Sequence, residues 1–408
     1  MSDIIEISWL KPYGPNSINR DENGNDKTVT VGGILRRRFA SQALKHIIRQ
    51  LLDIKYGHTF HTRYIVEVLV QIATELGFIT PGQEEKWAQA FNEITKVKKE
   101  DGTKKKKKTS KKNDEEEEEK EKKVMTVYSE EECYKIVEFV HKHGISKIDK
   151  NYKDALAKEL RNASVGIEIA LFGRMSAGGV GNTIYSAAHF NHAYSIDDYA
   201  GEFDYFIASD NFNPSGAGHL DHSAIGSNTM YGYENITPAQ VYENILPALE
   251  GLGLSEDELS EKKAELKKDI TAAIVDTIIN CLLVSPSGKQ STMASYPCPS
   301  AVYIRVVRNG APMTMDNAFN GVIRARHFPV TVEGAKRMVD HIRDDEYAQK
   351  YTYRVLCLDS VARQPENAEH IDAENQIGNK VQIRTIGELN DKIREELGKE
   401  VEDILSKL

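Results

Sequence analysis

The sequence predicts an α+β fold, in which helices and strands are mixed along the chain without a regular strand–helix repeat. Short segments of alternating polarity, such as residues 4–10, indicate strands. Longer segments with apolar residues at helical spacing, such as residues 41–52, indicate helices. Of the 408 residues, 40% are hydrophobic and 28% are charged, so the chain is able to bury a sizeable core.

The composition also excludes several classes of protein. No run of about 18 apolar residues is present, so we expect no contact with a membrane. The first residues lack the basic and apolar regions of a secretory signal. The four cysteines form no CxxC pair, which argues against a zinc ribbon or a disulfide scaffold and favours a reduced, cytoplasmic location.

The first half of the chain is predicted to begin with a strand and to continue mainly as helices. Residues 4–10 form the strand, because Ile5, Ile7 and Trp9 occupy alternate positions. A polar loop follows at 11–28, and Gly32-Gly33 indicates a turn. Capping boxes begin two of the helices, at Thr80 and Ser129. The predicted helices cover residues 41–52, 62–76, 80–97, 129–143 and 151–163.

The second half is predicted to alternate irregularly between strands and helices. The predicted strands cover residues 165–172, 184–196, 230–235, 301–307 and 353–358. One predicted helix begins at Thr237-Pro238. Three others cover residues 255–283, 331–350 and 385–404. Residues 197–230 are rich in Asp, Asn, Gly, Ser and aromatic residues and are too long for an ordinary connection, so we expect a functional excursion there.

Charge is distributed unevenly along the chain. The net charge of −9 argues by itself against nucleic-acid binding, but residues 27–50 contain six Lys or Arg and no Asp or Glu. In the helix at 41–52, Gln42, Lys45 and Arg49 lie opposite the apolar face, which suits a surface that binds phosphates. A solvated helix face is the alternative interpretation. Residues 98–123 combine lysine and glutamate runs and are predicted to form a disordered, solvated loop, with a nucleic-acid-binding lysine tract as the alternative.

Other polar groups offer weaker candidates for chemistry. Asp21, Glu22 and Asp26 could bind a metal ion for phosphoryl chemistry, although acidic residues in a loop of this composition more often stabilise turns. Two histidine pairs, at 189/192 and 219/222, could bind zinc only if their segments met. The glycine-rich residues 178–181 lack the lysine of a phosphate-binding loop, which argues against a nucleotide site. Because none of these candidates is specific, we predict neither a metal nor a cofactor.

Several motifs, in order along the chain, resemble one known family. Asn19-Arg20-Asp21-Glu22, Lys27, Gly32-Gly33, Arg36, Ser41-Gln42 and Leu44-Lys45 resemble the N-terminal signature of the CasC-type backbone subunit of the type I-E CRISPR Cascade complex. Gly173-Arg174-Met175, residues 189–198, residues 216–220, Gly288-Lys289-Gln290 and Asp316-Asn317-Ala318-Phe319 resemble its later motifs. The chain departs from the pattern at Ala40, Ala43 and His46.

The resemblance implies a hand-like subunit. An RRM-like (ferredoxin-like) palm would comprise residues 1–58, 164–196 and 231–408, helical fingers residues 59–163, and a β-thumb residues 197–230. Copies would assemble head to tail along a guide RNA, together with other Cascade subunits, and support pairing with target DNA in antiviral defence. Such a subunit binds RNA without regard to sequence and is not an enzyme.

The resemblance also implies a set of RNA-binding residues. Phosphate contacts would come mainly from the region around the helix at 41–52, and Met175 would lie against a base near the thumb. The full set is Arg20, Lys27, Arg36, Arg38, Ser41, Gln42, Lys45, Arg49, Arg174, Met175 and Lys289.

Two other functions remain open at this stage. Backbone subunits of type III complexes resemble this fold and cut target RNA with a loop aspartate, for which Asp21 or Asp26 would be the candidate. The chain could also be a free-standing RNA-binding protein with an RRM-like palm.

Overall fold

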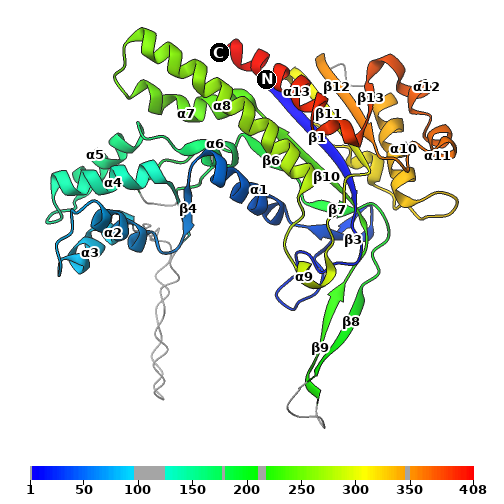
Figure 1. The fold of residues 1–408 in the computed structure, drawn as a ribbon, viewed down its shortest axis with the longest axis horizontal. Helices are drawn as coiled ribbons and strands as arrows, with labels where there is room; N and C mark the ends of the chain where they lie inside the picture. The colour runs from blue at the N-terminus through cyan, green and yellow to red at the C-terminus, as the bar shows by residue number, and fades with distance from the viewer. Residues whose placement is uncertain (1, 96–124, 177–179, 210–216, 345–349) are drawn as a thin grey trace, which may run out of the picture. The chain divides into compact units, whose positions relative to one another are not determined.

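The computed structural model describes residues 2–95, 125–176, 180–209, 217–344 and 350–408. The chain divides into two compact units (Figure 1). The sheet unit comprises Met1–Lys55, Ala187–Tyr242 and Ala264–Leu408, and the helical unit comprises Tyr56–Ser186 and Glu243–Lys263.

A nine-stranded sheet forms the framework of the sheet unit. Its strand order is β13-β12-β11-β1-β10-β7-β3-β2, with β6 also paired to β10. All pairs are antiparallel except β12 with β13. The strands are β1 (Ser2–Pro12), β2 (Thr28–Val31), β3 (Ile34–Phe39), β6 (Ala188–Phe190), β7 (Ala193–Ser195), β10 (Thr229–Ile236), β11 (Ala301–Gly310), β12 (Lys350–Leu358) and β13 (Gln382–Thr385).

The predicted opening strand is confirmed as β1, which lies at the centre of the sheet between β10 and β11. Trp9 lies opposite Gly232 of β10, and an added Cβ at Gly232 would overlap the Trp9 ring. Lys11 is also fully buried, and its Nζ donates to the carbonyls of Cys281 and Val284 at the end of a long helix, α8 (Glu256–Leu283). A buried ammonium there satisfies carbonyls that the helix leaves without partners.

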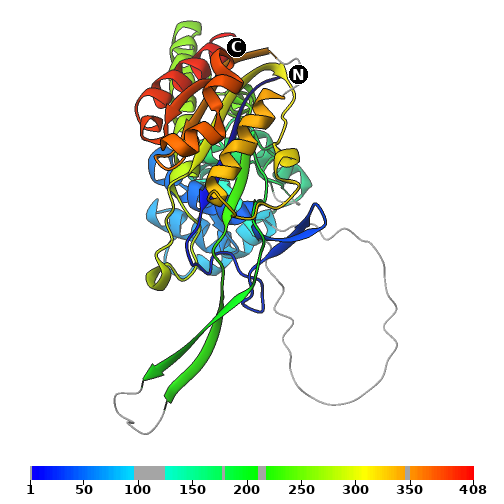
Figure 2. The same cartoon turned by 90° about the vertical axis from the view of Figure 1, so that its right-hand side faces the viewer.

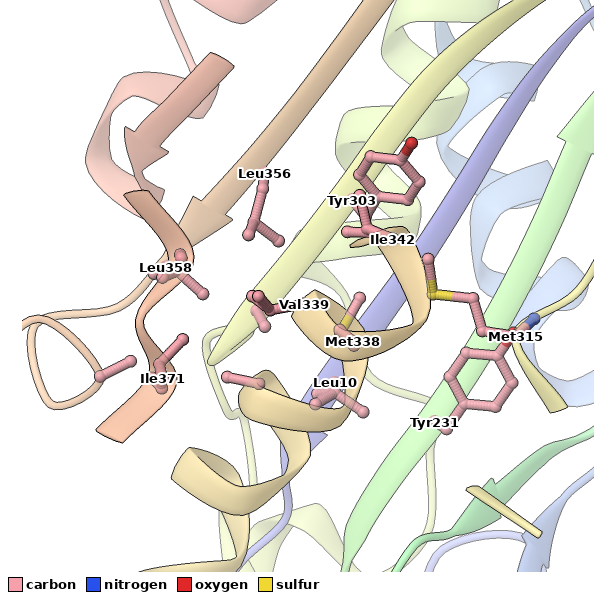
Figure 3. Close-up of a cluster of buried hydrophobic side chains, with 14 of the residues drawn as sticks. Leu10, Tyr231, Tyr303, Met315, Met338, Val339, Ile342, Leu356, Leu358 and Ile371 are labelled. Atoms are coloured by element: carbon pink, nitrogen blue, oxygen red, sulfur yellow. The ribbon is translucent and has the colours of Figure 1, made fainter. Parts of the chain in front are cut away.

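A hydrophobic core joins the sheet to α10 (Val330–Arg343). Met338, Val339 and Ile342 of this helix pack against Leu10, Tyr231 and other side chains from β1, β10, β11 and β12 (Figure 3). The remaining helices of this unit are α1 (Ser41–Tyr56), α9 (Gln290–Met293), η1 (Asp316–Phe319), α11 (Pro365–Ile371), α12 (Ala373–Ile377), η2 (Gly378–Lys380), η3 (Ile386–Leu389) and α13 (Lys392–Ser406).

The excursion predicted between residues 197 and 230 contains an antiparallel hairpin. Its strands are β8 (Glu202–Ser209) and β9 (Ala217–Ile225), and Tyr205 pairs with His222. The hairpin leaves the sheet unit between β7 and β10 (Figures 1 and 2). Regular backbone pairing therefore organises a segment whose composition indicated only an irregular excursion.

The helical unit has a separate apolar core. Leu69, Phe91, Ile136 and Leu156 are buried in it. The capping box predicted at Ser129 is confirmed, because Ser129 Oγ accepts from Glu132 N–H while Glu132 Oε2 accepts from Ser129 N–H. The elements of this unit are β4 (Thr59–Thr62), α2 (Ile65–Glu75), α3 (Glu84–Thr95), β5 (Thr126–Ser129), α4 (Glu130–His143), α5 (Lys150–Leu160), α6 (Gly166–Phe172) and most of α7 (Pro238–Glu250).

The strand predicted at 165–172 is wrong, because these residues form helix α6. Alternating apolar residues in such a short run do not distinguish a strand from a buried helix. In the structure Ala170 and Phe172 are buried as well as Ile169 and Leu171, so the segment is enclosed on most sides. The buried Glu168 accepts hydrogen bonds from neighbouring strand β4 and is thereby satisfied.

Three predicted helix boundaries are also wrong. Helix α3 begins at Glu84, because Thr80 accepts from Gln83 N–H in a turn before the helix. Helix α10 ends at Arg343, and the helix predicted from 385 begins only at Lys392, after strand β13 and turn η3. The predicted charged loop at 98–123 lies outside the described residues.

The α+β class is confirmed by the sheet and its surrounding helices. The RRM-like character of the palm and the division into palm, fingers and thumb stay predictions. Among the described residues, none of the helices has the length and apolar character needed to cross a membrane.

Candidate nucleic-acid interface

Three separate chain segments meet at the N-terminus of α1. Ala40 precedes the helix and has no side-chain acceptor of its own. Asn19 Oδ1 accepts from Ala40 N–H at 2.7 Å, and His192 Nδ1 accepts from Ser41 N–H at 2.9 Å. Asn19 adopts a left-handed backbone conformation, φ 56°, which asparagine tolerates better than most residues. The loop before β2 and the connection before β7 therefore both hold the start of this helix.

The prediction that α1 is amphipathic is confirmed. Leu44, Ile48 and Leu52 are buried, whereas Gln42 is exposed. Leu51, one of the apolar residues at helical spacing in this segment, is 38% exposed. The helix thus anchors one face in the sheet unit and leaves its polar face open.

Lys45 and Arg49 lie on that polar face and are half-buried. Lys45 Nζ lies 5.4 Å from the centre of the Phe190 ring, which orients the ammonium group by a cation–π contact. Burial, and then the neighbouring Arg49 charge, lower the pKa of Lys45. A bound phosphate would offset both effects by supplying a negative charge.

Lys27 and Arg38 add positive charge at the same helix end. Arg38 N–H donates to the Lys27 carbonyl at 2.8 Å, so the two residues are adjacent where β2 begins and β3 ends. Partial burial, together with the Arg38 and Lys27 charges, lowers the pKa of His192 and favours the neutral ring that accepts from Ser41. Arg20 lies in the same loop and forms an isolated backbone bridge with Asp26. Positive side chains beside a helix N-terminus create a favourable site for an anion.

The arginine run contributes less to this surface than the sequence suggested. Arg36 and Arg37 are both fully buried, and only Arg38 is partly exposed. Arg36 donates to the carbonyls of Ser195, Phe319 and Asn320. The buried guanidinium of Arg36 is directed at the protein backbone, so we remove Arg36 from the expected phosphate contacts.

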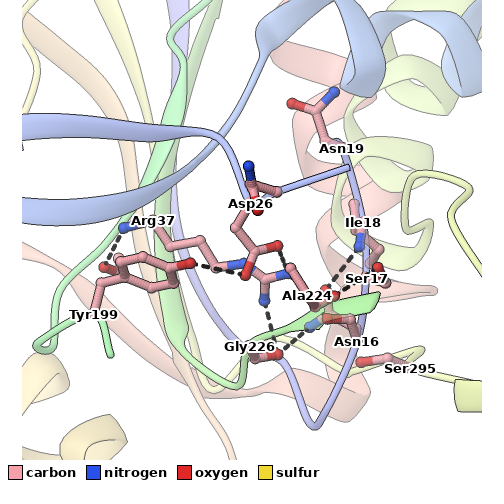
Figure 4. Close-up of polar contacts among 12 residues, drawn as sticks. Asn16, Ser17, Ile18, Asn19, Asp26, Arg37, Tyr199, Ala224, Gly226 and Ser295 are labelled. Carbon is pink, nitrogen blue, oxygen red and sulfur yellow. Dashed lines mark hydrogen bonds and ion pairs between the residues drawn. The ribbon is translucent and has the colours of Figure 1, made fainter. Parts of the chain in front are cut away.

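Arg37 and Asp26 form a buried ion pair at the base of the hairpin (Figure 4). Arg37 Nη2 lies 2.7 Å from Asp26 Oδ1, and Arg37 also donates to the carbonyls of Asn16 and Gly226. Tyr199 OH donates to the other carboxylate oxygen of Asp26 at 3.3 Å. Both oxygens of Asp26 therefore bind protein groups. The ion pair joins the loop before β2 to β3, and the hydrogen bonds to Tyr199 and Gly226 connect it to the base of the hairpin.

The other acidic candidate, Asp21, stabilises a turn. Its Oδ1 accepts from the N–H groups of Asn23 and Asn25. This is the turn-stabilising role that the sequence offered as the alternative to metal binding. Within the described residues, no group of three or more His, Cys, Asp or Glu side chains is placed to hold a metal ion. His189 instead lies 3.2 Å from Asn235 Oδ1.

Two predicted site residues belong to the helical unit. The Arg174 side chain is only 4% exposed and makes a bidentate ion pair with Glu132, so we remove it from the expected RNA contacts. Met175 is 86% exposed, which leaves its side chain available to a ligand. The remaining predicted residue, Lys289, belongs to the sheet unit, where its Nζ lies 4.7 Å from the centre of the Phe206 ring on the hairpin.

The hairpin presents aromatic side chains on one face. Phe203 and Tyr205 are 50% and 72% exposed, and both lie near the His222 ring. Exposed aromatic rings on a strand pair are able to stack on nucleic-acid bases. The surface thus combines cations at α1 with aromatic rings on the hairpin.

The sequence interpretation missed the capping roles of Asn19 and His192. Neither is recognisable from its own neighbours, because each acts on a helix distant in sequence. The detectable signal was Ala40, an N-cap residue without a side-chain acceptor, which implies that the acceptor comes from elsewhere.

Comparisons with known proteins relate the chain to one family and to solved structures. Residues 5–387 match the model of the family described as "CT1975-like protein". A solved structure entitled "CRISPR RNA-guided surveillance complex, pre-nicking" contains a chain with 18% identity and a TM-score of 0.67, covering 98% of this chain and 100% of that one. Another, entitled "CRISPR RNA-guided surveillance complex", has 17% identity and a TM-score of 0.53, covering 98% of both chains.

The search of curated proteins found no match. At these identities the two solved structures show a shared fold. The family model spans most of the sequence, from β1 to the start of η3. This protein therefore belongs to the CT1975-like family.

Proposed function

We propose that the protein is an RNA-binding backbone subunit of a CRISPR surveillance complex of the type I-E Cascade class. Copies polymerise head to tail along a guide RNA, together with other Cascade subunits, and support pairing of the guide with target DNA. The family membership and the fold shared with chains of surveillance complexes support this role. The ordered motifs that resemble the CasC type support the narrower assignment.

The observation that carries the proposal is the arrangement around α1. Lys27, Arg38, Lys45 and Arg49 come from a loop, a strand and a helix, and residues 27–50 include no acidic residue. Ser41 and Gln42 add polar groups at the helix N-terminus. These groups recognise phosphates and do not read base edges, so binding is independent of sequence and weakens as salt rises.

Sequence recognition is left to base pairing between guide and target. The exposed rings of Phe203 and Tyr205 contact bases by stacking, which tolerates any base. The protein performs no chemistry in this role. Asp26, one of the two candidates for a catalytic aspartate, has both carboxylate oxygens bound by Arg37 and Tyr199.

Co-expression with a CRISPR array transcript tests the proposal. The purified material is expected to be a large particle that contains RNA of one discrete length, measured by its absorbance ratio and its mass. Lys45→Ala/Arg49→Ala is expected to reduce the bound RNA strongly. High salt should have the same effect on the wild type.

The matched control is Lys392→Ala/Lys399→Ala, which removes two exposed cations from another helix, α13. This variant should retain RNA. The proposal fails if the wild type remains a nucleic-acid-free monomer even when guide RNA and partner subunits are present. It also fails if both double variants lose RNA equally, because the effect would then depend on net charge alone.

A further inference from the structure

A groove of about 340 Å³ lies at the carboxyl end of β12, beside helices α11 and α12. Its floor includes Leu358, Ile371 and Ile383, and the first two belong to the hydrophobic core of the sheet unit (Figure 3). Helices α11 and α12 lie on the connection from β12 to β13, the parallel pair of the described sheet. Ligands commonly bind outside the carboxyl ends of parallel strands that are connected through helices. We name this feature the α11–α12 groove.

The rim of the α11–α12 groove is acidic. Glu369 lies on α11, Asp372 joins the two helices, and Glu374 lies in the first turn of α12. The one cation that lines the groove is Arg363. Residues 359–374 contain five Asp or Glu and one Lys or Arg. The groove therefore repels a polyanion, whereas the interface at α1 attracts one.

Two of the rim carboxylates are available to a ligand. Glu369 and Glu374 are exposed, and their carboxylates form no hydrogen bond or ion pair within the described part of the chain. On α13, by contrast, the exposed Glu395 pairs with Lys399 four positions later. The residues four positions after Glu369 and Glu374 are an alanine and a glycine, which supply no cation. A positive group from outside the chain is therefore able to pair with both carboxylates.

The joint between the two helices holds the backbone of the rim in place. Asp372 adopts a left-handed conformation, φ 52°, and its N–H donates to the Ala368 carbonyl at 2.8 Å. Its Oδ1 accepts from Asn375 Nδ2 at 2.6 Å. The buried Asn367 fixes the preceding turn, because its Nδ2 donates to the Val361 carbonyl at 2.8 Å. A backbone fixed in this way loses little conformational entropy when a partner binds.

An apolar floor below a carboxylate rim fits a lysine side chain. Lysine packs its methylene stem on apolar surface while its ammonium group remains beside water and acidic groups. A nucleic acid would bring phosphates close to the rim carboxylates. A fully apolar segment would bury those carboxylates without partners, which is costly.

We propose that the α11–α12 groove is a docking site for a lysine-rich segment of a partner protein. A lysine stem lies on the apolar floor, and the ammonium groups pair with Glu369 and Glu374. The surplus of carboxylates over Arg363 favours a segment with several lysines. The groove adjoins β12 and β13 at one edge of the sheet, whereas β2 and β3, beside the interface at α1, form the other edge. Docking therefore goes beyond the proposed function and does not require RNA at α1.

The test titrates the full chain, freed of nucleic acid, into fluorescein-labelled hexalysine and records the anisotropy. Glu369→Gln/Glu374→Gln is expected to weaken binding roughly tenfold, from two lost exposed charge pairs. The control, Glu395→Gln/Glu402→Gln, changes the net charge equally on α13 and should bind as wild type does. A second labelled peptide, made of 2,4-diaminobutyric acid, carries the same charge on stems two methylene groups shorter. It should bind wild type roughly fivefold more weakly, because less apolar surface is buried.

Carbodiimide coupling locates the bound peptide. The reagent takes up water as an amide forms between a lysine amine and a nearby carboxylate, and mass spectrometry is expected to place this amide at Glu369 or Glu374. Amide links confined to other carboxylates would exclude the groove.

Other results would overturn the inference in distinguishable ways. Equal losses in the test and control variants would reduce binding to net charge. Equal affinity for the two peptides would exclude a role for the apolar floor. Spermidine that binds as tightly as hexalysine would identify the ligand as a free polyamine in place of a protein. Because each measurement uses the chain without RNA, a failure to bind guide RNA would refute the proposed function and leave this docking site standing.

Discussion

Replacing Asp26 with asparagine should destabilise the sheet unit severely. The substitution keeps the size of the side chain but removes the charge that faces Arg37, whose side chain is 1% exposed. Arg37 would keep the carbonyls of Asn16 and Gly226 but lose its only carboxylate among the described residues. Leaving one member of a buried ion pair without its partner costs about 3–5 kcal/mol. We take about 3 kcal/mol, since the amide oxygen still accepts a hydrogen bond.

Urea unfolding followed by fluorescence measures this effect. With a slope of about 3 kcal/mol per molar, the midpoint for the sheet unit should fall by about 1 M. Asp21→Asn is the control, because Asp21 is exposed and an asparagine oxygen is able to accept the same turn hydrogen bonds. An unchanged midpoint for Asp26→Asn would refute the structural role. If the variant also bound RNA normally but lost magnesium-dependent RNA cleavage, Asp26 would be catalytic and the nuclease alternative would replace our proposal.

Two further variants test the packing around β1. Gly232→Ala adds a methyl group where the Trp9 ring lies, so urea denaturation should show a loss of about 3 kcal/mol or more, and an unchanged midpoint would contradict the close approach. Burial raises the pKa of Glu234 from 4.5 to about 7, although Lys11 and the Trp9 hydrogen bond oppose the shift. The folded chain then retains this proton to higher pH than the unfolded chain, so this carboxyl should lower the free energy of unfolding by about 3 kcal/mol in total as pH rises between 4.5 and 7. Glu234→Gln should remove that slope, and parallel pH profiles for variant and wild type would exclude Glu234 as its source.

Local signals predicted the elements that depend on local physics. The capping box at Ser129 and the apolar spacing of α1 were interpreted correctly, because hydrogen bonds within one turn and a single apolar face specify each of them. The segment at 166–172 was assigned wrongly because its conformation depends on enclosure by neighbouring elements. Composition indicated hairpin β8–β9 only as an excursion, and β structure there was expected from the family resemblance alone, since pairing across the turn follows from register and leaves a weak trace in composition.

The sequence by itself determined the α+β class, the amphipathic helix with its cations and the ordered motifs that indicated a family. It did not determine which cations reach the surface. Arg36, Arg37 and Arg38 are adjacent and chemically identical, yet only Arg38 remains partly exposed. Alternation along β3 does not explain the difference, because Arg36 and the partly exposed Arg38 share one side of the strand and Arg37 points to the other. Arg36 is buried because it meets the Ser195 carbonyl from another strand, and Arg37 is buried because it meets the Asp26 carboxylate. Exposure is a property of the assembled neighbours, so only the tertiary structure decided it.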